Sequence, residues 1–160
     1  MIHRKRYTWD HYKHHGNIPI KQTYARIYIE SKQKFIIVSK DNIKRQIPWW
    51  KPKTWESPLE TLCREVWEET SINLRYVWKI EKSELFWYYY IEDGWVDYLQ
   101  LRYFIKIDDL NEDSLKSNEI DKDDSINYVK LVSVKDIRKV MPYLRDSWEL
   151  NYFLNGKHFL

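Results

Sequence analysis

The sequence predicts an α/β domain in which a mixed sheet lies between helices. The order of patterns along the chain is strands, one strongly amphipathic helix, more strands, and further helices near the C-terminus. At 160 residues the chain is long enough for one domain with a substantial core and too short for two. Hydrophobic residues make up 43% and charged residues 32%, which is typical of a globular rather than a disordered protein.

The first part of the chain predicts a basic segment followed by a β-hairpin. Residues 1–20 are basic and polar. Residues 23–29 and 34–39 are rich in β-branched and aromatic side chains and are joined by a short polar link, which indicates two antiparallel strands. A polar connection at 40–45 then leads to the stretch PWWKPKTWESPLETLCREVWEETSI at 48–72.

A helix is predicted to begin inside that stretch. Ser57 can cap the free backbone amides, Pro58 suits the first helical position, and Glu60 completes a capping box. The helix then has one apolar stripe, whose members recur at steps of three and four: Leu59, Leu62, Cys63 and Val66.

The same helix carries three carboxylates on another face. Glu65, Glu68 and Glu69 stand at i, i+3 and i+4, so their like charges lie close together. That crowding is unfavourable in an isolated helix. A divalent cation such as Mg²⁺ would remove the penalty, because hard ions take oxygen ligands.

The second part of the chain predicts more strands, an acidic loop and two helices. The predicted strands are 73–80, 83–91, 97–107 and 126–131, the loop is 108–125, and the helices are 133–140 and 145–154. In 97–107 apolar and polar residues alternate, which predicts a strand with one buried face. The chain is therefore expected to be one domain, 1–160, with C-terminal helices from about residue 133.

The net charge and the cysteine content limit the expected binding partners and the expected cellular location of the chain. The net charge of +3 is mild and does not by itself indicate nucleic acid or an anionic membrane. The one cysteine, Cys63, excludes an intrachain disulfide and lies on the apolar stripe, where a small core residue is expected. The N-terminus has no apolar signal region and no window is apolar enough to span a membrane, so the predicted location is cytoplasmic.

The spacing of the charged residues resembles the Nudix box. That pattern contains Glu, seven residues, and Arg-Glu-apolar-any-Glu-Glu, and the chain matches it with Glu56, seven residues, and Arg64-Glu65-Val66-Trp67-Glu68-Glu69. The resemblance implies a Nudix-like α/β/α sandwich with a mixed β-sheet. It also implies a magnesium-dependent hydrolase, with Mn²⁺ as an alternative metal, acting on a nucleoside diphosphate linked to another moiety. The expected molecule is a monomer or homodimer.

The resemblance further implies roles for individual residues. Glu68 and Glu69 are expected to be metal ligands, and Glu65 a ligand or the base that activates water. Arg64, four residues after Glu60 and eight after Glu56, is expected to orient the carboxylates by ion pairing, with direct contact to a substrate phosphate as the lesser option.

Other expected site residues lie outside the carboxylate helix. The backbone carbonyl of residue 49 or 50 completes the metal site in the family. Lys51 and Arg102 are candidates for contact with substrate phosphates. The candidates for a further acidic ligand are Glu112, Glu119 and Asp121 in the acidic loop.

The departures from the family pattern fall at glycine positions. Trp49, Trp50 and Trp55 stand where the box and its common extension have glycine, and Ser71 stands at the later glycine position. A tight loop beside a metal favours residues that adopt positive φ, and tryptophan does so poorly. The chain has nine Trp and three Gly, and together these are 12 of 160 residues, close to the ordinary glycine content of about 7%. One hypothesis is that several of these Trp are UGA-encoded glycines read as tryptophan.

Two other classes of function remain open beside the hydrolase. If the Trp residues are genuine, the chain is a catalytically impaired Nudix-fold domain with a binding or regulatory role. A nucleic-acid-binding module would use the aromatic residues for stacking, but it needs a clustered basic face, whereas Lys and Arg are scattered along this sequence.

Overall fold

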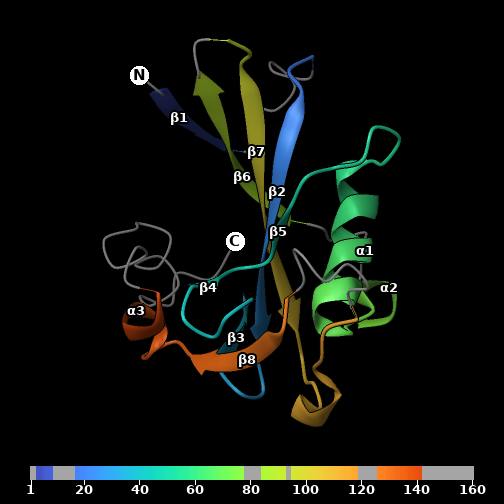
Figure 1. Ribbon diagram of the computed structural model, residues 1–160, viewed down its shortest axis with the longest axis vertical. Helices are drawn as coiled ribbons and strands as arrows, with labels where there is room; N and C mark the ends of the chain where they lie inside the picture. Colours follow the sequence, from blue (N-terminus) through green and yellow to red (C-terminus); the bar gives the residue numbers. More distant parts are fainter. Residues whose placement is uncertain (1–2, 9–16, 78–83, 93–94, 119–125, 142–160) are drawn as a thin grey trace.

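The structure is a computed structural model that describes residues 3–8, 17–77, 84–92, 95–118 and 126–141 (Figure 1). The strands are β1 (His3–Thr8), β2 (Ile20–Ile29), β3 (Lys34–Ser39), β4 (Arg45–Gln46), β5 (Trp49–Trp50), β6 (Glu84–Glu92), β7 (Tyr98–Ile107) and β8 (Tyr128–Ser133). The helices are α1 (Pro58–Thr70), α2 (Leu74–Val77) and α3 (Ile137–Val140), and a 3₁₀ turn covers Glu112–Ser114.

The strands form one mixed sheet, as the sequence predicts. The order is β1-β6-β7-β2-β3-β4, with β5 paired to β2 and β8 paired to β3. The central pair β2–β7 is parallel, and the other pairs are antiparallel. The predicted hairpin is confirmed, because β2 and β3 pair with Tyr28 opposite Phe35 and Ile29 opposite Lys34.

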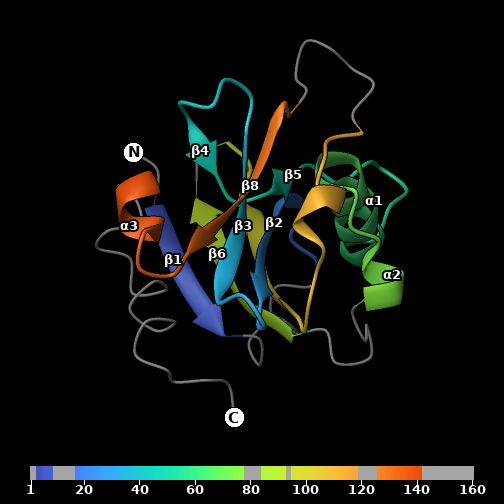
Figure 2. The same ribbon diagram turned by 90° about the horizontal axis from the view of Figure 1, so that it is seen from below.

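Helices cover both faces of the sheet, which gives the expected three layers (Figure 2). On the α1 side, Ala25 and Ile27 of β2 and Leu101 of β7 pack with Leu62 and Val66 of the helix. A second cluster on the other face joins Phe35, Ile37 and Phe104 to residues of α3 and its flanks, including Ile137 and Met141. The first cluster holds α1 against the middle of the sheet, and the second holds α3 against the other face.

The strand predicted at 73–80 is wrong where the structure describes it. Residues 74–77 form α2 instead. The Asn73 side chain accepts a hydrogen bond from the Arg75 backbone amide at 3.2 Å, which favours a helical turn. Leu74 is fully buried in the core beside α1, so tertiary packing also holds this turn. Residues 78–80 lie outside the described part of the chain.

The prediction that 97–107 buries only one face is also wrong. Gln100, Arg102 and Phe104 are buried, like the apolar residues between them. The reason is that β7 lies between β6 and β2 with a core cluster on each face: Leu99 and Leu101 pack on the α1 side and Phe104 packs on the other. In a strand that is covered on both faces, alternation of apolar and polar residues no longer indicates which face is exposed to solvent.

The two ends of the chain differ from the sequence-based boundaries. Part of the basic segment 1–20 forms β1, which pairs with β6. The third helix begins at Ile137 rather than Ser133, although Ser133 Oγ does accept a hydrogen bond from the Asp136 amide at 3.1 Å. The helix predicted at 145–154 lies outside the described residues. Among the described helices, none is long and apolar enough to cross a membrane.

Candidate active site

The start of α1 is built by the capping box that the sequence predicts. Ser57 Oγ accepts a hydrogen bond from the Glu60 amide at 3.2 Å, and the Glu60 carboxylate accepts one from the Ser57 amide at 2.8 Å. Pro58 occupies the first helical position. Because Leu62 and Val66 are fully buried, the helix presents Glu65 and Glu68 away from the core.

Arg64 lies at the centre of a network of carboxylates. Its Nε and Nη2 atoms contact the two oxygens of Glu56 at 2.6 and 2.8 Å. Its Nη1 atom contacts Glu65 at 2.7 Å and Glu68 at 3.0 Å. The guanidinium therefore orients three carboxylates at once, and these contacts raise the pKa of Arg64. Of the two partners that spacing allowed, Glu56 forms the bidentate pair, while Glu60 closes the capping box.

The Glu56 side chain connects the loop before α1 to the helix through hydrogen bonds to residues of both. Besides Arg64, its carboxylate accepts hydrogen bonds from Thr61 Oγ1 at 3.1 Å and from the Lys53 amide at 3.4 Å. The hydrogen bonds from Arg64, helped by Lys53 and Thr61, lower the pKa of Glu56 from 4.5 to about 2. Glu56 thus stays ionised at any ordinary pH.

The other carboxylates differ in burial. The side chains of Glu65 and Glu68 are 15% and 31% exposed, whereas Glu69 is buried at 4%. Within the described ranges, no three His, Cys, Asp or Glu side chains are arranged as ligands of one metal ion. The expected metal centre therefore stays a proposal.

The chemistry of these residues fits a hard divalent cation. Glu65, Glu68 and Glu69 supply only oxygen donors, which Mg²⁺ and Mn²⁺ prefer. A carboxylate as deeply buried as Glu69 also needs a neighbouring positive charge or hydrogen-bond donors to offset its desolvation.

The loop positions 49 and 50 form strand β5 rather than a tight turn. Trp50 pairs with Thr23 and Trp49 with Tyr24, and the Ala25 amide donates to the Pro48 carbonyl at 3.0 Å. In the described part of the chain, the non-glycine residues with positive φ are Gln33, Asn42 and Ser71. Trp49, Trp50 and Trp55 therefore do not adopt positive φ in this structure.

Ser71, at the later glycine position, does adopt a left-handed conformation, with φ 63° and ψ 11°. It ends α1, and its amide donates to the Trp67 carbonyl at 2.9 Å. A left-handed residue is the usual end of a helix and favours glycine, so the structure gives the physical reason for glycine at this position.

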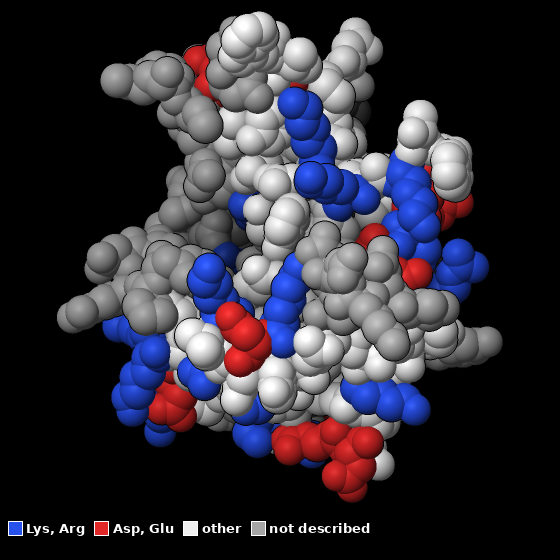
Figure 3. Space-filling model, in the orientation of Figure 1, with Lys and Arg blue, Asp and Glu red and all other residues white. Residues whose placement is uncertain are grey.

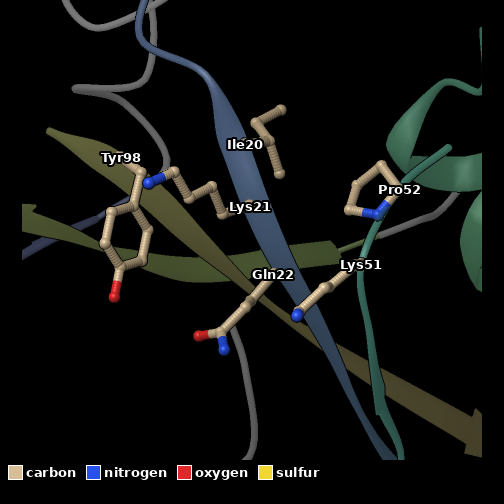
Figure 4. A pocket seen from close by; sticks show the side chains of 6 residues that line it. All are labelled: Ile20, Lys21, Gln22, Lys51, Pro52 and Tyr98. Carbon is tan, nitrogen blue, oxygen red and sulfur yellow. The ribbon is translucent and has the colours of Figure 1, made fainter. Parts of the chain in front are cut away.

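The two substrate-binding candidates lie in different surroundings. Lys51 is exposed and lines a pocket of about 400 Å³ together with Ile20, Lys21, Gln22, Pro52 and Tyr98 (Figure 4). Arg102 is buried, with its guanidinium 3.3 Å from the centre of the Tyr24 ring and hydrogen-bonded to Gln100 at 2.9 Å. Lys51 is thus open to a ligand, and Arg102 is held inside the sheet.

Sequence reasoning missed a polar row on the sheet face opposite α1. Gln100 donates to Gln22, and Tyr24 is flanked by Arg102 and by the stacked ring of Trp49, whose centroid is 5.8 Å away. The parallel register brings these residues of β2 and β7 together. No local pattern reports a pairing between segments so far apart in sequence.

The candidates for an acidic ligand from the loop gain no support from the structure. Glu112 is exposed and pairs with Lys34 at 3.0 Å. Glu119 and Asp121 lie outside the described residues. Cys63 packs against the core cluster, and burial raises the pKa of its thiol, as expected for a structural cysteine.

Comparison with solved structures identifies the fold. A Caenorhabditis elegans Ap4A hydrolase complex aligns over 85% of this chain and 96% of its own, with a TM-score of 0.59 and 15% identity. The Bacillus subtilis pyrophosphohydrolase BsRppH covers 88% and 84%, with a TM-score of 0.58 and 16% identity. The NUDIX domain of Shewanella oneidensis NrtR, complexed with ADP ribose, covers 76% and 77%, with a TM-score of 0.51 and 14% identity. The chain has the Nudix fold. No family model matches the sequence, and no curated protein matches it either.

Within this Nudix fold, Glu56 of the box lies in the loop before α1, Arg64 to Glu69 of the box lie on α1, and β5 carries positions 49 and 50. The Nudix-like sandwich predicted from the sequence is thereby confirmed. Arg64, Glu65 and Glu68 lie on the side of α1 away from the core, and Arg64 contacts Glu56 in the loop before the helix.

Proposed function

We propose that this chain is a pyrophosphohydrolase that cleaves a nucleoside diphosphate linked to another moiety, with water attacking a phosphorus atom. The observation that carries the proposal is the network around Arg64, which contacts Glu65 and Glu68 on α1 and Glu56 in the loop before it. Similar structures include an Ap4A hydrolase and a pyrophosphohydrolase, which supports the same class of bond.

In this proposal Glu68 and Glu69 hold Mg²⁺ or Mn²⁺, and Glu65 is a third ligand or the base. The bound cation would neutralise the charge of the diphosphate and make the phosphorus more electrophilic. Arg64 Nη1 contacts the Glu65 carboxylate at 2.7 Å and so holds it in place on α1. Arg64 serves as a positioning residue, since its donors contact Glu56, Glu65 and Glu68.

Lys51 is proposed to bind a phosphate of the substrate. Its side chain is exposed, and Figure 4 shows its amine directed to the same side as the Gln22 amide at the pocket. The burial of Arg102 favours a supporting role in the sheet rather than direct contact with phosphate.

A binding domain without turnover is the second candidate. It is favoured by Trp49 and Trp50, whose side chains take up space beside Tyr24 and α1 where the family has glycine. The NrtR domain complexed with ADP ribose is a Nudix-fold neighbour of the kind that this candidate would resemble. A nucleic-acid module receives less support, because on the face shown in Figure 3 the Lys and Arg residues are spread out with Asp and Glu among them.

The test is a screen for Mg²⁺-dependent phosphate or nucleotide release across nucleoside triphosphates, dinucleoside polyphosphates, ADP-ribose and capped RNA. We expect Glu68→Gln and Glu69→Gln each to lower kcat by about 100-fold or more, a loss typical of a catalytic group. Glu60→Gln is the matched control on the same helix, because it keeps an acceptor for the Ser57 amide and should leave kcat unchanged.

Wild-type rates in both Glu68→Gln and Glu69→Gln would remove the metal-site assignment. Tight binding of one nucleotide class by calorimetry, with no release of product from any substrate, would favour the binding domain instead.

A further inference from the structure

The segment that follows the 3₁₀ turn is docked onto the C-terminal end of α1. The Asn118 amide donates to the Glu68 carbonyl at 2.6 Å, and the Asn118 side chain donates to the Trp67 carbonyl at 3.0 Å. The same side chain donates to Ser71 Oγ at 2.7 Å, and Ser71 Oγ donates to the Lys116 carbonyl at 2.9 Å.

These contacts satisfy backbone groups that a helix leaves open. The last four carbonyls of an α-helix have no partner within the helix, and the final turn frays unless something holds it. The Asn118 amide supplies a donor to the open Glu68 carbonyl, and the Asn118 side chain adds a second donor to the Trp67 carbonyl, which already accepts from the Ser71 amide. Glu68 and Glu69 belong to this turn, so any fraying would displace their carboxylates.

Ser71 adds a contact that glycine cannot make. A glycine would relax the left-handed backbone at this position, but it has no hydroxyl to bridge Asn118 and Lys116. The serine at a family glycine position therefore joins the helix end to the docked segment.

We propose that Asn118 is a positioning residue that fixes the turn bearing Glu68 and Glu69 for cation binding. The proposal rests on the proposed function for its metal ligands, but its test does not require turnover. Manganese binding to the substrate-free chain is measured by electron paramagnetic resonance, alongside the thermal unfolding midpoint.

Asn118→Ala is expected to weaken Mn²⁺ binding about three- to tenfold, less than the roughly 10- to 100-fold cost of losing a partner that contacts a ligand directly. Asn111→Ala is the matched control. Asn111 lies in the same loop, and its hydrogen bonds lie within the 3₁₀ turn: its side chain accepts from the Asp113 amide at 3.1 Å, and its carbonyl accepts from Ser114 Oγ at 2.6 Å. It should lower the unfolding midpoint slightly and leave Mn²⁺ affinity unchanged.

Wild-type Mn²⁺ affinity in Asn118→Ala, or equal weakening in Asn111→Ala, would overturn the role of Asn118. A wild-type chain that binds Mn²⁺ but hydrolyses no diphosphate would overturn the proposed function and leave the role of Asn118 intact.

A second inference concerns the tryptophans and rests on their burial. Tryptophan is normally well buried, and its indole N–H finds a hydrogen-bond partner when it is. Here Trp55, Trp67 and Trp95 are 81%, 47% and 95% exposed. Trp50 is buried at 4%, and its indole nitrogen has no hydrogen-bond partner. Four of the tryptophans in the described residues thus occupy poor sites for an indole.

The family pattern adds an independent reason at three positions. Trp49, Trp50 and Trp55 coincide with glycines of the box and its extension, and glycine is scarce elsewhere in the chain. The structure assigns no packing role to the Trp55 side chain, which lies in the exposed turn before Glu56. We infer that the natural polypeptide has glycine at 49, 50 and 55, encoded by UGA in a genetic code that reads this codon as glycine.

The codons and the two chains test this inference together. We expect the gene to have UGA codons at positions 49, 50 and 55. We also expect mass spectrometry of the protein from the cells that carry the gene to find peptides with glycine at these positions. The chain with glycine at these positions should unfold at the same or a higher temperature than the chain with tryptophan. Trp95→Gly is the comparison for exposure alone, because Trp95 is exposed like Trp55 but lies outside the box.

UGG codons at positions 49, 50 and 55 would overturn the inference of natural glycines directly. A clear fall in unfolding temperature for Trp50→Gly would also do so, since removing a large side chain that truly belongs to a core leaves a destabilising cavity.

Discussion

The ion pair between Glu56 and Arg64 allows a quantitative prediction about stability. In Glu56→Gln the bidentate contact at 2.6 and 2.8 Å loses its negative charge, while Glu65 and Glu68 still contact the guanidinium. The pKa of Glu56 falls from 4.5 to about 2 in the folded chain. At about 1.36 kcal/mol per pKa unit, the charged form contributes at most roughly 3 kcal/mol.

The expected loss is smaller than that limit, because glutamine can still accept from Thr61 and Arg64 keeps two partners. We expect Glu56→Gln to lower the free energy of unfolding by about 2 kcal/mol at pH 7. For a chain of this length that corresponds to a fall of roughly 4–8 °C in the unfolding midpoint.

The pH dependence has a defined sign. A carboxyl whose pKa is lowered on folding stabilises the native state above its unfolded pKa and loses that contribution as the pH falls through its folded pKa. The contribution of Glu56 is therefore complete above pH 4.5 and is lost between there and about pH 2. The difference between wild type and Glu56→Gln should shrink by more than half at about pH 3.

The assay is urea unfolding followed by circular dichroism at pH 7, 5 and 3. Glu112→Gln is the control, since Glu112 forms one exposed ion pair with Lys34 at 3.0 Å. Its effect should stay within about 0.5 kcal/mol at every pH. An equal loss for Glu56→Gln at pH 7 and pH 3 would refute the electrostatic account, as would a loss no larger than that of the control.

Two further predictions address the helix cap and the pocket. Ser57→Ala removes the acceptor for the Glu60 amide and should lower the free energy of unfolding by about 1 kcal/mol in urea titrations; an unchanged value would show that the cap carries no stability. Lys51→Ala should raise KM for a diphosphate substrate with little change in kcat or in the unfolding midpoint, because Lys51 is exposed and is proposed to contact phosphate. A fall in kcat at unchanged KM would argue against that role.

Helix α1 was predictable because its signals are local. The Ser57–Glu60 capping box and the apolar stripe of Leu62 and Val66 depend only on residues within a few turns. The resemblance to the Nudix box was equally readable, since it depends on fixed gaps between charged residues. The hairpin of β2 and β3 was predictable for the same reason, because one short link joins its strands.

The choice of ion partners and the burial of β7 were not predictable from local patterns. Spacing allowed Arg64 to pair with Glu56 or Glu60, and the choice depended on the path of the loop into α1. Gln100 and Arg102 have the polarity of an exposed strand face. They are buried because β7 lies inside the sheet and pairs with β2 in parallel, far away in sequence.

The sequence by itself determined the type of chemistry that the chain can offer: a capped helix whose carboxylates and arginine stand at fixed intervals. Helical geometry converts those intervals into shared faces without help from the rest of the molecule. Only the tertiary structure decided which residues hold that helix in place. Residues 74–77 form the short helix α2 instead of a strand. Asn118 contacts the last turn of α1 although the two are about fifty residues apart in sequence. Such contacts depend on how distant segments meet when the core is buried, and no local period in the sequence encodes them.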